Sequence, residues 1–485
     1  MTKARGRKAA TVVSAAQAAR QALVAKEFAA ADLGDKRRER RVRSIAAAVA
    51  AKPATPFPRA LATEGDLEGF YRLVRNEAVS FDDLLTPHVA ATVGRMTGGG
   101  EVLAVHDTTQ FAFGGTRRGL GRLNQSGHGF LSQFTLAVSA EGARTPLGVL
   151  AVESWVRQEP TKTALLKQRK VTYADSYELP NEQDRWLRGV DAAEAVVAGA
   201  VSLIHVMDSE ADDYELMAKL VAARRRWIIR LCYDRVLANT EPGAPHKTKE
   251  LVASRKVRCR RTVHLSRRRR QPGGDKRSRT RVRKERDAIL AISATPVVFR
   301  RPSYCTDSAT TLSVNIVAVR EVNPPPDDEP VAWLLLSTEP IDTEEQILTV
   351  VDSYRGRWVI EEYFKAIKTG CAYEKRQLES WHTLLNALGV IIPIAWSLLH
   401  LRTVARVEGS APARTVLTEL EEKVLRAAVT TPLPRAATAR DVMLAIARLG
   451  GHLRSNGEPG WQVLGRGYQD LLMMTAGYRL AQAEK

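Results

Sequence analysis

Two short apolar segments that each run into an aspartate constrain the fold of this chain more than any other feature. They are Glu101-Val-Leu-Ala-Val-His-Asp107 and Val201-Ser-Leu-Ile-His-Val-Met-Asp208. Short runs rich in β-branched and aliphatic residues predict buried strands. In an open sheet, binding sites form where strands end, so Asp107 and Asp208 are candidate site residues in an α/β fold. An acid after a buried strand is also a common turn or cap residue, so neither aspartate identifies a site alone.

The rest of the chain falls into segments of different character. At 485 residues it is long enough for two or three domains. Residues 10–88 favour helices, and so does the chain from Glu344 onward. Between them, residues 235–345 are expected to form an inserted β-rich unit. Further strands are expected at Phe134–Val138, Leu147–Val152 and Val331–Leu336.

The charge of the chain predicts a polyanionic partner. There are 73 Lys and Arg against 54 Asp and Glu, a net charge of +19. Basic side chains that neutralise phosphates release condensed counterions, so we expect nucleic acid. Lys36–Arg43 places six Lys or Arg at the start of an expected helix, which suits a DNA groove or backbone. Arg37 and Arg40 are therefore candidate DNA contacts, although these charges also suit a solvated helix face.

The cysteines and the apolar segments argue against other classes of protein. The four cysteines lie far apart, with no C-x-x-C pair and no histidine at metal-ligand spacing. This pattern disfavours a zinc site or a disulfide framework and favours a reducing cytoplasm. The most apolar stretch, Ala387–Leu401, contains Pro393 and is shorter than the ~20 residues that a membrane span needs. We therefore expect no membrane role.

A helix expected around Glu361 places one acid among side chains that suit phosphate. Phosphodiester chemistry needs an in-line nucleophile and cations that absorb charge on the phosphate oxygens. Two magnesium ions ~3.5–4 Å apart can do this, and they prefer carboxylate ligands. At about 100° per residue, one helical stripe would hold Tyr354, Arg357, Glu361, Lys365 and Lys368. The stripe suits a metal ligand flanked by phosphate contacts, but it also suits an amphipathic helix in which Glu361 and Lys365 pair.

Several short motifs, in their order along the chain, resemble one transposase family. The pattern Tyr354-x2-Arg357-x3-Glu361-x6-Lys368 is similar to the signature of the IS-four superfamily of bacterial DDE transposases. The resemblance is closest to the transposon Tn-five branch and extends over nearly the whole chain. The other strings that carry it are Ala31–Arg38, Tyr71–Asn76, His106–Thr109, Asp208–Asp212, Trp333–Pro340 and Ala445–Gly451.

The resemblance implies a multidomain α/β protein with a ribonuclease-H-like catalytic core. An N-terminal helical DNA-binding domain would occupy residues 1–88. The catalytic domain would occupy residues 89–400, with the inserted β-rich subdomain at about 235–345. A C-terminal helical domain, residues 401–485, would mediate dimerisation.

The resemblance also implies roles for single residues. The ligands of two Mg²⁺ ions, for which Mn²⁺ could substitute, would be Asp107, Asp208 and Glu361. The contacts to transposon-end phosphates would be Tyr354, Arg357, Lys365 and Lys368. Trp333 would stack on a flipped base, and Arg230 would contact DNA. Ser209 departs from the family, whose members often carry Arg there, and the Arg-rich insert at 267–286 reflects either target-DNA affinity or composition.

The function expected from these observations is that of a homodimeric cut-and-paste transposase acting on double-stranded DNA in the bacterial cytoplasm, associated with the nucleoid. It would bind terminal inverted repeats, cleave them through a hairpin intermediate and transfer the 3′ ends to target DNA. Two alternatives are a domesticated DNA-binding protein that no longer cuts and a two-metal structure-selective nuclease. The intact acid triad argues against the first, and the Trp333 and Tyr354 features argue against the second.

Overall fold

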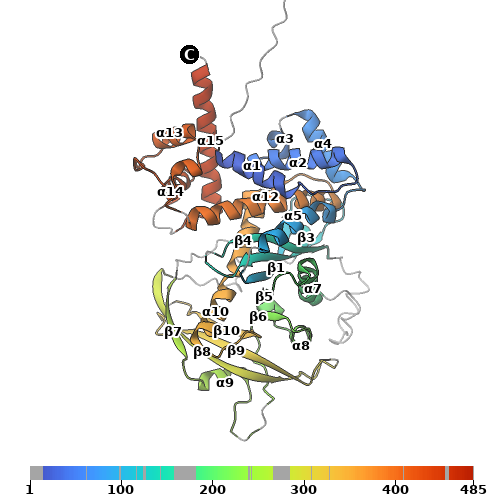
Figure 1. Cartoon of the computed structure of the whole chain (residues 1–485), viewed down its shortest axis with the longest axis vertical. Helices are drawn as coiled ribbons and strands as arrows, with labels where there is room; N and C mark the ends of the chain where they lie inside the picture. The colour runs from blue at the N-terminus through green and yellow to red at the C-terminus, as the bar shows by residue number, and fades with distance from the viewer. Residues whose placement is uncertain are drawn as a thin grey trace, which may run out of the picture. The chain divides into compact units, whose positions relative to one another are not determined.

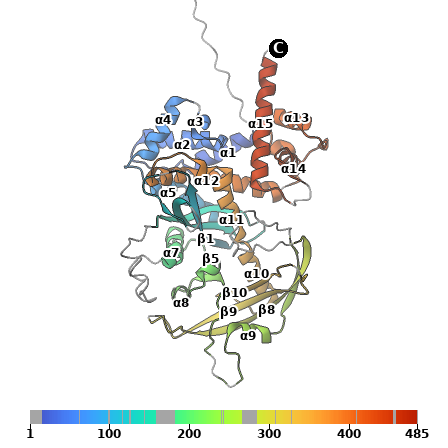
Figure 2. The same cartoon turned by 180° about the vertical axis from the view of Figure 1, so that it is seen from behind.

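The chain forms two compact units (Figure 1, Figure 2). One combines Met1–Pro87 with Lys365–Lys485, and the other is His88–Phe364. The three functional ranges expected from the sequence stay a prediction, since compactness assigns no function to a unit. The computed structural model describes residues 15–61, 63–97, 100–115, 117–123, 127–142, 144–157, 182–238, 241, 243–265, 284–306, 308–326, 328–407, 409–453 and 458–483.

The described part of the His88–Phe364 unit is built on a ten-stranded mixed sheet. The strand order is β2-β3-β1-β5-β6-β10-β9-β8-β7, and β4 also pairs with β3. This sheet and its helices confirm the expected α/β class. The strands are β1 Val102–Phe113, β2 Gly121–Arg122, β3 His128–Ser139, β4 Pro146–Trp155, β5 Leu203–Met207, β6 Arg226–Arg230, β7 Cys259–Leu265, β8 Arg286–Arg300, β9 Thr311–Glu321 and β10 Ala332–Ser337.

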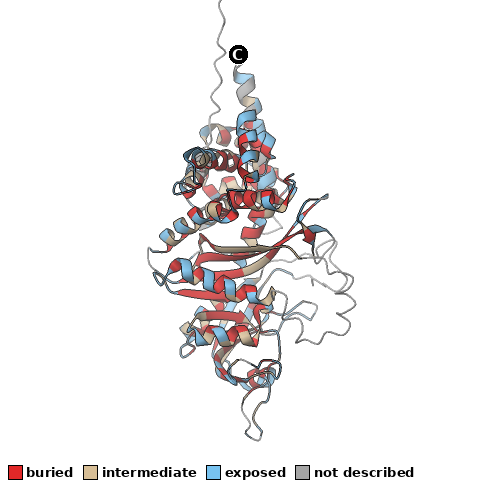
Figure 3. Cartoon of the chain, turned by 90° about the vertical axis from the view of Figure 1, so that its right-hand side faces the viewer, coloured by how far each residue is buried: buried red, intermediate tan, exposed pale blue. Residues whose placement is uncertain are grey.

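Strand β1 lies between an antiparallel neighbour and a parallel one. It pairs with β3 along its whole length and with β5 over its first four residues. Every residue of β5 and nearly every residue of β3 is buried (Figure 3). Phe111 and Phe113 of β1 pack against Phe130 of β3, with ring centroids 5.3 and 5.9 Å apart. The expectation that the first strand ends at Asp107 is therefore wrong, because these phenylalanines keep the residues after Asp107 in the ladder.

The segment expected to be β-rich extends the same sheet. β10 pairs antiparallel with β6, and β9, β8 and β7 follow it in antiparallel pairs. The core residues of these strands pack with α8 (Tyr214–Ala222) and α9 (Thr248–Ser254), around Trp227 and Phe299. The expected β-rich content is confirmed. Of the Arg-rich insert, residues 267–283 lie outside the described residues.

The other unit is helical and contains the long helix α12 (Trp381–Val407), which packs against α1, α2 and α4. Buried Asn386 of α12 donates hydrogen bonds to the carbonyls of Val74 (3.2 Å) and Val79 (2.8 Å). The helices of this unit are α1 Ala15–Glu27, α2 Lys36–Ala51, α3 Phe57–Ala60, α4 Glu64–Arg75, α13 Glu419–Ala428, α14 Ala439–Leu449 and α15 Trp461–Ala483, and α5 (Phe81–Met96) begins in it.

The apolar part of α12 is longer than the sequence pattern predicts. By length and composition, the stretch Trp381–Thr403 could cross a membrane, but 78% of its apolar window is buried within the structure. Pro393 lies inside the helix rather than ending it. Burial of this extent is typical of the core helix of a folded domain.

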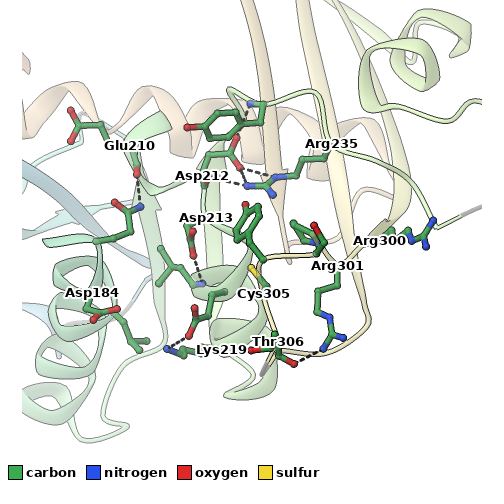
Figure 4. Close-up of a pocket in the computed structure, with 18 of the residues that line it drawn as sticks. Asp184, Glu210, Asp212, Asp213, Lys219, Arg235, Arg300, Arg301, Cys305 and Thr306 are labelled. Carbon is green, nitrogen blue, oxygen red and sulfur yellow. Dashed lines mark hydrogen bonds and ion pairs between the residues drawn. The ribbon is translucent and has the colours of Figure 1, made fainter. Parts of the chain in front are cut away.

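A buried ion pair fixes the loop that follows the second acid motif (Figure 4). The side chain of Asp212 is 0% exposed and that of Arg235 is 8% exposed. Arg235 donates from Nε to the Asp212 carboxylate (2.9 Å) and from Nη2 to the Asp212 carbonyl (2.8 Å). The other carboxylate oxygen accepts the N–H groups of Cys232 (2.7 Å) and Tyr233 (2.9 Å). The pair thus joins the start of α8 to the chain that leaves β6.

Removal of one partner of this pair should destabilise the protein strongly. Asp212→Ala leaves a buried, uncompensated guanidinium, which should lower the free energy of unfolding by about 3–5 kcal/mol. Glu215→Ala on α8 is the matched control, because its partner Lys219 is 2.8 Å away but 46% exposed. That variant should lose less than about 1 kcal/mol. Urea unfolding followed by circular dichroism measures both, and equal losses would contradict a structural role for Asp212.

Candidate active site

Three parallel strands bring two acids and an arginine into one row. Each paired residue of β1 faces the residue of β5 numbered 101 higher, and each paired residue of β5 faces the residue of β6 numbered 22 higher. Asp208 is numbered 101 above Asp107, and Arg230 is 22 above Asp208. Neighbouring residues in register point to the same side of a sheet. The strand pairs end at Val105–Val206 and Met207–Ile229, and the same register continued one or two residues further would place Asp107, Asp208 and Arg230 side by side.

Glu361 reaches this region from an interrupted helical segment rather than from the single helix that the sequence predicts. The interruption falls at Gly356 and Arg357, where the chain packs closely on β1: a Cβ on Gly356 would lie 2.7 Å from Cδ1 of Leu103. The expectation of one continuous helical stripe is therefore wrong. In its place are α10 Glu344–Arg355, α11 Trp358–Lys365 and the π-helical turn η4 Ala366–Gly370.

Arg357, in the turn between α10 and α11, joins the first and third acids. Its Nη1 lies 2.9 Å from Oδ2 of Asp107, and its Nη2 lies 2.6 Å from Oε1 of Glu361. Its Nε–H is buried and has no hydrogen-bond acceptor among the described residues. In this arrangement, the described part of the chain holds no group of three Asp, Glu, His or Cys side chains placed to bind a metal. The assignment of the metal ligands stays a prediction.

The acids nevertheless act on one another electrostatically. The pKa of Asp107 is raised to about 7, chiefly by burial, which Arg357 opposes; the charges of Asp208 and Glu361 also contribute to the rise. Both acids are thus close enough to disfavour a charge on Asp107. Three carboxylates that act on one another in this way form a donor set that suits a hard divalent cation.

A buried polar chain lies next to the first acid. His106 Nε2 is 2.9 Å from His205 Nδ1, and His205 Nε2 is 3.0 Å from Oε1 of Glu194. At the other end, the hydroxyl of Thr135 is 3.0 Å from His106 Nδ1. Burial lowers the pKa of both imidazoles. The chain links β1, β3, β5 and α7 (Arg185–Val197), so it helps to fix the register on which the acid row depends.

Three of the expected DNA contacts gather beside the acids. Tyr354 is 4% exposed, and burial raises its pKa while Arg357 and Arg230, which also hydrogen-bonds it, oppose that shift. Trp333 on β10 is half-buried and meets the Tyr354 ring edge-on, with centroids 5.7 Å apart. The structure thus brings Arg230, Tyr354 and Trp333 together, and it buries Tyr354, whose side chain the resemblance would place against transposon-end DNA.

The other expected DNA contacts belong to the helical unit. Arg37 and Arg40 are exposed on the first turns of α2, whose N-terminus is capped by Asp35. Lys365 is exposed at the end of α11, and Lys368 is half-buried in η4, where burial lowers its pKa. Their contacts with DNA stay predictions.

The sequence gives no indication of Arg185, which lies between the two aspartate motifs. This arginine is the first residue of α7, is 7% exposed, and hydrogen-bonds the side chains of Thr108 and Glu210. Thr108 follows Asp107, and Glu210 is the second residue after Asp208. These partners are 77 and 25 residues away along the chain, so no local pattern could have revealed the contacts.

An open pocket of about 1570 Å³ lies beside these residues (Figure 4). Arg185 and Glu210 line it, together with the start of α8 and the loop around Tyr304. Much of its charged wall is engaged internally, as in the ion pairs Asp212–Arg235 and Glu215–Lys219. The wall therefore supports the segment after Asp208, and we assign the pocket no ligand.

Two parts of the chain match transposase families. Residues 20–79 match the family Transposase DNA-binding, and residues 161–396 match the family Transposase DDE domain. The first match contains Arg37 and Arg40, and the second contains Asp208 and Glu361, while Asp107 precedes it. The chain therefore carries a stretch similar to transposase DNA-binding domains and a stretch similar to DDE transposase domains. These two matches support a transposase that binds and acts on DNA, and DDE transposase domains generally use divalent metal ions.

A solved structure was also found to be similar to this transposase. It is described as the cryo-EM structure of the piggyBac transposase synaptic complex with hairpin DNA. The two chains are 12% identical, the match covers 77% of this chain and 67% of that one, and the TM-score is 0.33. So low a TM-score does not establish a common fold.

The raised pKa of Asp107 should make the stability of the transposase depend on pH. The carboxyl titrates at 3.8 when unperturbed and at about 7 in the folded protein. Ionisation of Asp107 therefore costs folding free energy that accumulates as the pH rises between these values. Asp107→Asn removes this cost, so in EDTA its Tm advantage over the wild type should grow from pH 5 to pH 7 and then level off. Thermal melts across this range measure the difference, and a Tm difference that does not change with pH would contradict the raised pKa.

Proposed function

We propose that this chain is a cut-and-paste transposase of the IS-four superfamily, in its Tn-five branch. It would bind the inverted repeats at the ends of its transposon, cleave them through a hairpin intermediate and transfer the 3′ ends to target DNA. The observation that carries this proposal is the row of Asp107 and Asp208 in strand register, with Glu361 tied to Asp107 through Arg357. Phosphodiester cleavage with two metal ions requires several carboxylates close together, and here they come from different strands and a helix.

The strand arrangement supports a ribonuclease-H-like core. In the order β4-β3-β1-β5-β6, β3 is antiparallel to both of its neighbours β4 and β1, and β1, β5 and β6 are parallel. We assign these five strands to the core and β7 to β10 to the insert. In this arrangement, the two aspartates come from neighbouring parallel strands of the core.

We propose Mg²⁺, as two ions, for the cofactor, with Mn²⁺ able to replace it. When bound, the ions would neutralise charge on the phosphate oxygens and make a water molecule more acidic. Asp107, Asp208 and Glu361 would hold them, and Arg357 would release the two carboxylates that it binds in the absence of metal. The effect of Asp208 and Glu361 on the pKa of Asp107 supports this fit.

The side chains around the acids suit the scissile strand. A guanidinium binds a phosphate as it binds a carboxylate, so Arg357 can exchange one for the other. Its buried Nε–H, for which the described residues offer no acceptor, is a further donor for a phosphate oxygen. Arg230, on the same side of the sheet, and Tyr354 would contact the same strand, while Lys365 and Lys368 would hold phosphates further along.

The proposed reaction takes place in four chemical steps. Activated water first cleaves a phosphodiester bond and frees a 3′-hydroxyl. This hydroxyl attacks a phosphate of the opposite strand, forms a hairpin and releases the flanking DNA. Water then reopens the hairpin, and the regenerated 3′-hydroxyl attacks target DNA. We propose that two protomers act together through the C-terminal helices, residues 401–485, and that they act in the cytoplasm, where the nucleoid lies.

The acid triad and the basic N-terminal helix should have separable roles. Asp107→Ala, Asp208→Ala and Glu361→Ala should each abolish Mg²⁺-dependent cleavage of inverted-repeat DNA and leave end binding unchanged, because each removes a metal ligand. Arg37→Ala/Arg40→Ala should weaken end binding and flatten its dependence on salt, because phosphate contacts are lost. Gel-shift and strand-cleavage assays on the neighbouring inverted repeats measure both properties.

Other outcomes of this experiment identify the alternatives. Residual cleavage by a triad variant would remove that residue from the metal ligands. A wild-type protein that binds ends but never cuts them would be a domesticated DNA-binding protein, and one that cuts branched DNA without joining ends would be a nuclease. Light scattering on the inactive complexes gives their composition, for which two chains and two ends are expected.

Trp333 should matter for the hairpin and little for the first nick. A hairpin bends DNA sharply, so a base can leave the DNA stack. Stacking of that base on an indole would stabilise the hairpin by ~1–3 kcal/mol per base. Trp333→Ala should therefore slow hairpin formation roughly ten- to a hundredfold and accumulate nicked ends. Tyr304→Ala, which removes an aromatic side chain that is 56% exposed, is the control and should leave both steps unchanged. Equal loss of nicking and hairpins, with a lowered Tm, would make Trp333 a structural partner of Tyr354.

A further inference from the structure

The two aspartates are held by their neighbours in the same way. The backbone N–H of Thr108 donates to Oδ1 of Asp107 at 2.8 Å. The backbone N–H of Glu210 donates to Oδ1 of Asp208, also at 2.8 Å. Each carboxylate is therefore oriented by an N–H from the residue one or two positions after it.

A single guanidinium holds both of these neighbours. Arg185 donates from Nε to the hydroxyl of Thr108 (2.9 Å) and from Nη2 to the carboxylate of Glu210 (2.8 Å). Its Nη1 donates to the carbonyl of Glu182 (2.7 Å), which anchors it to its own segment. Gln183 donates to the carbonyl of Glu210 at 2.8 Å and so fixes the same loop from a second point.

We propose that Arg185 is a positioning residue that sets the separation of Asp107 and Asp208, and with it the affinity of the site for a divalent cation. This inference rests on the proposed function, in which both acids bind metal. A guanidinium is planar and donates in fixed directions, so it can hold two acceptors at a set distance. Arg185 is 7% exposed and its donors are directed at protein acceptors, so we assign it to the protein rather than to a phosphate.

The expected size of the effect follows from the position of Arg185 behind the ligands. Side chains that orient metal ligands typically change metal affinity ten- to a hundredfold when they are removed. Arg185→Met keeps much of the buried volume and removes all donors, so it should fall in that range. Arg185→Lys keeps the positive charge but loses the planar guanidinium with its several donors. Its affinity for the cation should therefore lie between those of Arg185→Met and the wild type.

The experiment measures Mn²⁺ binding directly, on the full-length protein without DNA. Electron paramagnetic resonance measures the concentration of unbound Mn²⁺, from which the affinity of the protein follows. This affinity should be roughly ten- to a hundredfold weaker in Arg185→Met than in the wild type, with a smaller loss in Arg185→Lys. Arg188→Met is the matched control, because Arg188 lies on the same helix, is 45% exposed and pairs with Glu153. That variant should bind Mn²⁺ like the wild type. In cleavage assays, the Mg²⁺ concentration for half-maximal rate should rise in Arg185→Met, while saturating Mg²⁺ should restore most of the rate.

Two milder variants keep the proposal testable if Arg185→Met does not fold. Thr108→Val and Glu210→Gln each disturb one acceptor of Arg185, and each should weaken Mn²⁺ binding several-fold. When Thr108→Val or Glu210→Gln is combined with Arg185→Lys, the loss of Mn²⁺ affinity should be smaller than the sum of the two single losses. The reason is that each substitution disturbs the same hydrogen bonds of the Arg185 guanidinium. Wild-type Mn²⁺ affinity in the Arg185 and Glu210 variants would overturn the proposal.

Failure of the proposed function would look different. If Asp107→Ala and Asp208→Ala also bind Mn²⁺ like the wild type, the acids are not the metal ligands and the proposed function fails at its base. If these two variants lose Mn²⁺ while Arg185→Met retains it, only the positioning role of Arg185 is overturned. A fall in Tm with unchanged Mn²⁺ affinity would make Arg185 purely structural, which also overturns the proposal.

Discussion

The parallel register of β1, β5 and β6 is the constraint on which the site depends. Side chains alternate between the two faces of a sheet, so a slip of one residue in either pair would move an acid or Arg230 to the opposite side. The register is held by buried strands on both sides and by the polar chain through His106 and His205. Because the row is set by backbone pairing, its residues need no flexible loop to bring them together.

The second feature of the site is the balance between acids and arginines. Burial and like charges oppose ionisation of Asp107, and Arg357 only partly offsets them. Arg357 bridges two acids through their oxygens, whereas Arg185 acts on the residues beside two acids. Perturbed acids of this kind are common at functional sites, where folding free energy is given up for chemistry. The arrangement stores charge repulsion that a cation can relieve.

The parts of the site that could be predicted are those with a local signal. The β5 run ends in Asp208, and the basic start of α2 follows from Lys36–Arg43. The end of β1 was predicted wrongly, since three polar residues after Asp107 hide the buried phenylalanines beyond them. The helical stripe is interrupted next to Gly356, which packs on Leu103, more than 250 residues earlier in the chain. The helical periodicity of a sequence carries no information about a contact between residues so far apart. The hydrogen bonds of Arg185 to Thr108 and Glu210 could not be predicted for the same reason.

The pairing of β10 with β6 limits how the inserted strands β7 to β10 can vary in length. Without β10, β6 would be an edge strand with a row of unsatisfied N–H and C=O groups, open to pairing with another chain. The insert therefore protects the core from aggregation, and it cannot be deleted as a surface loop can. Strands β8 and β7 lie farther out, separated from β6 by β10 and β9, so a change in either of them leaves the pairing that covers β6 in place.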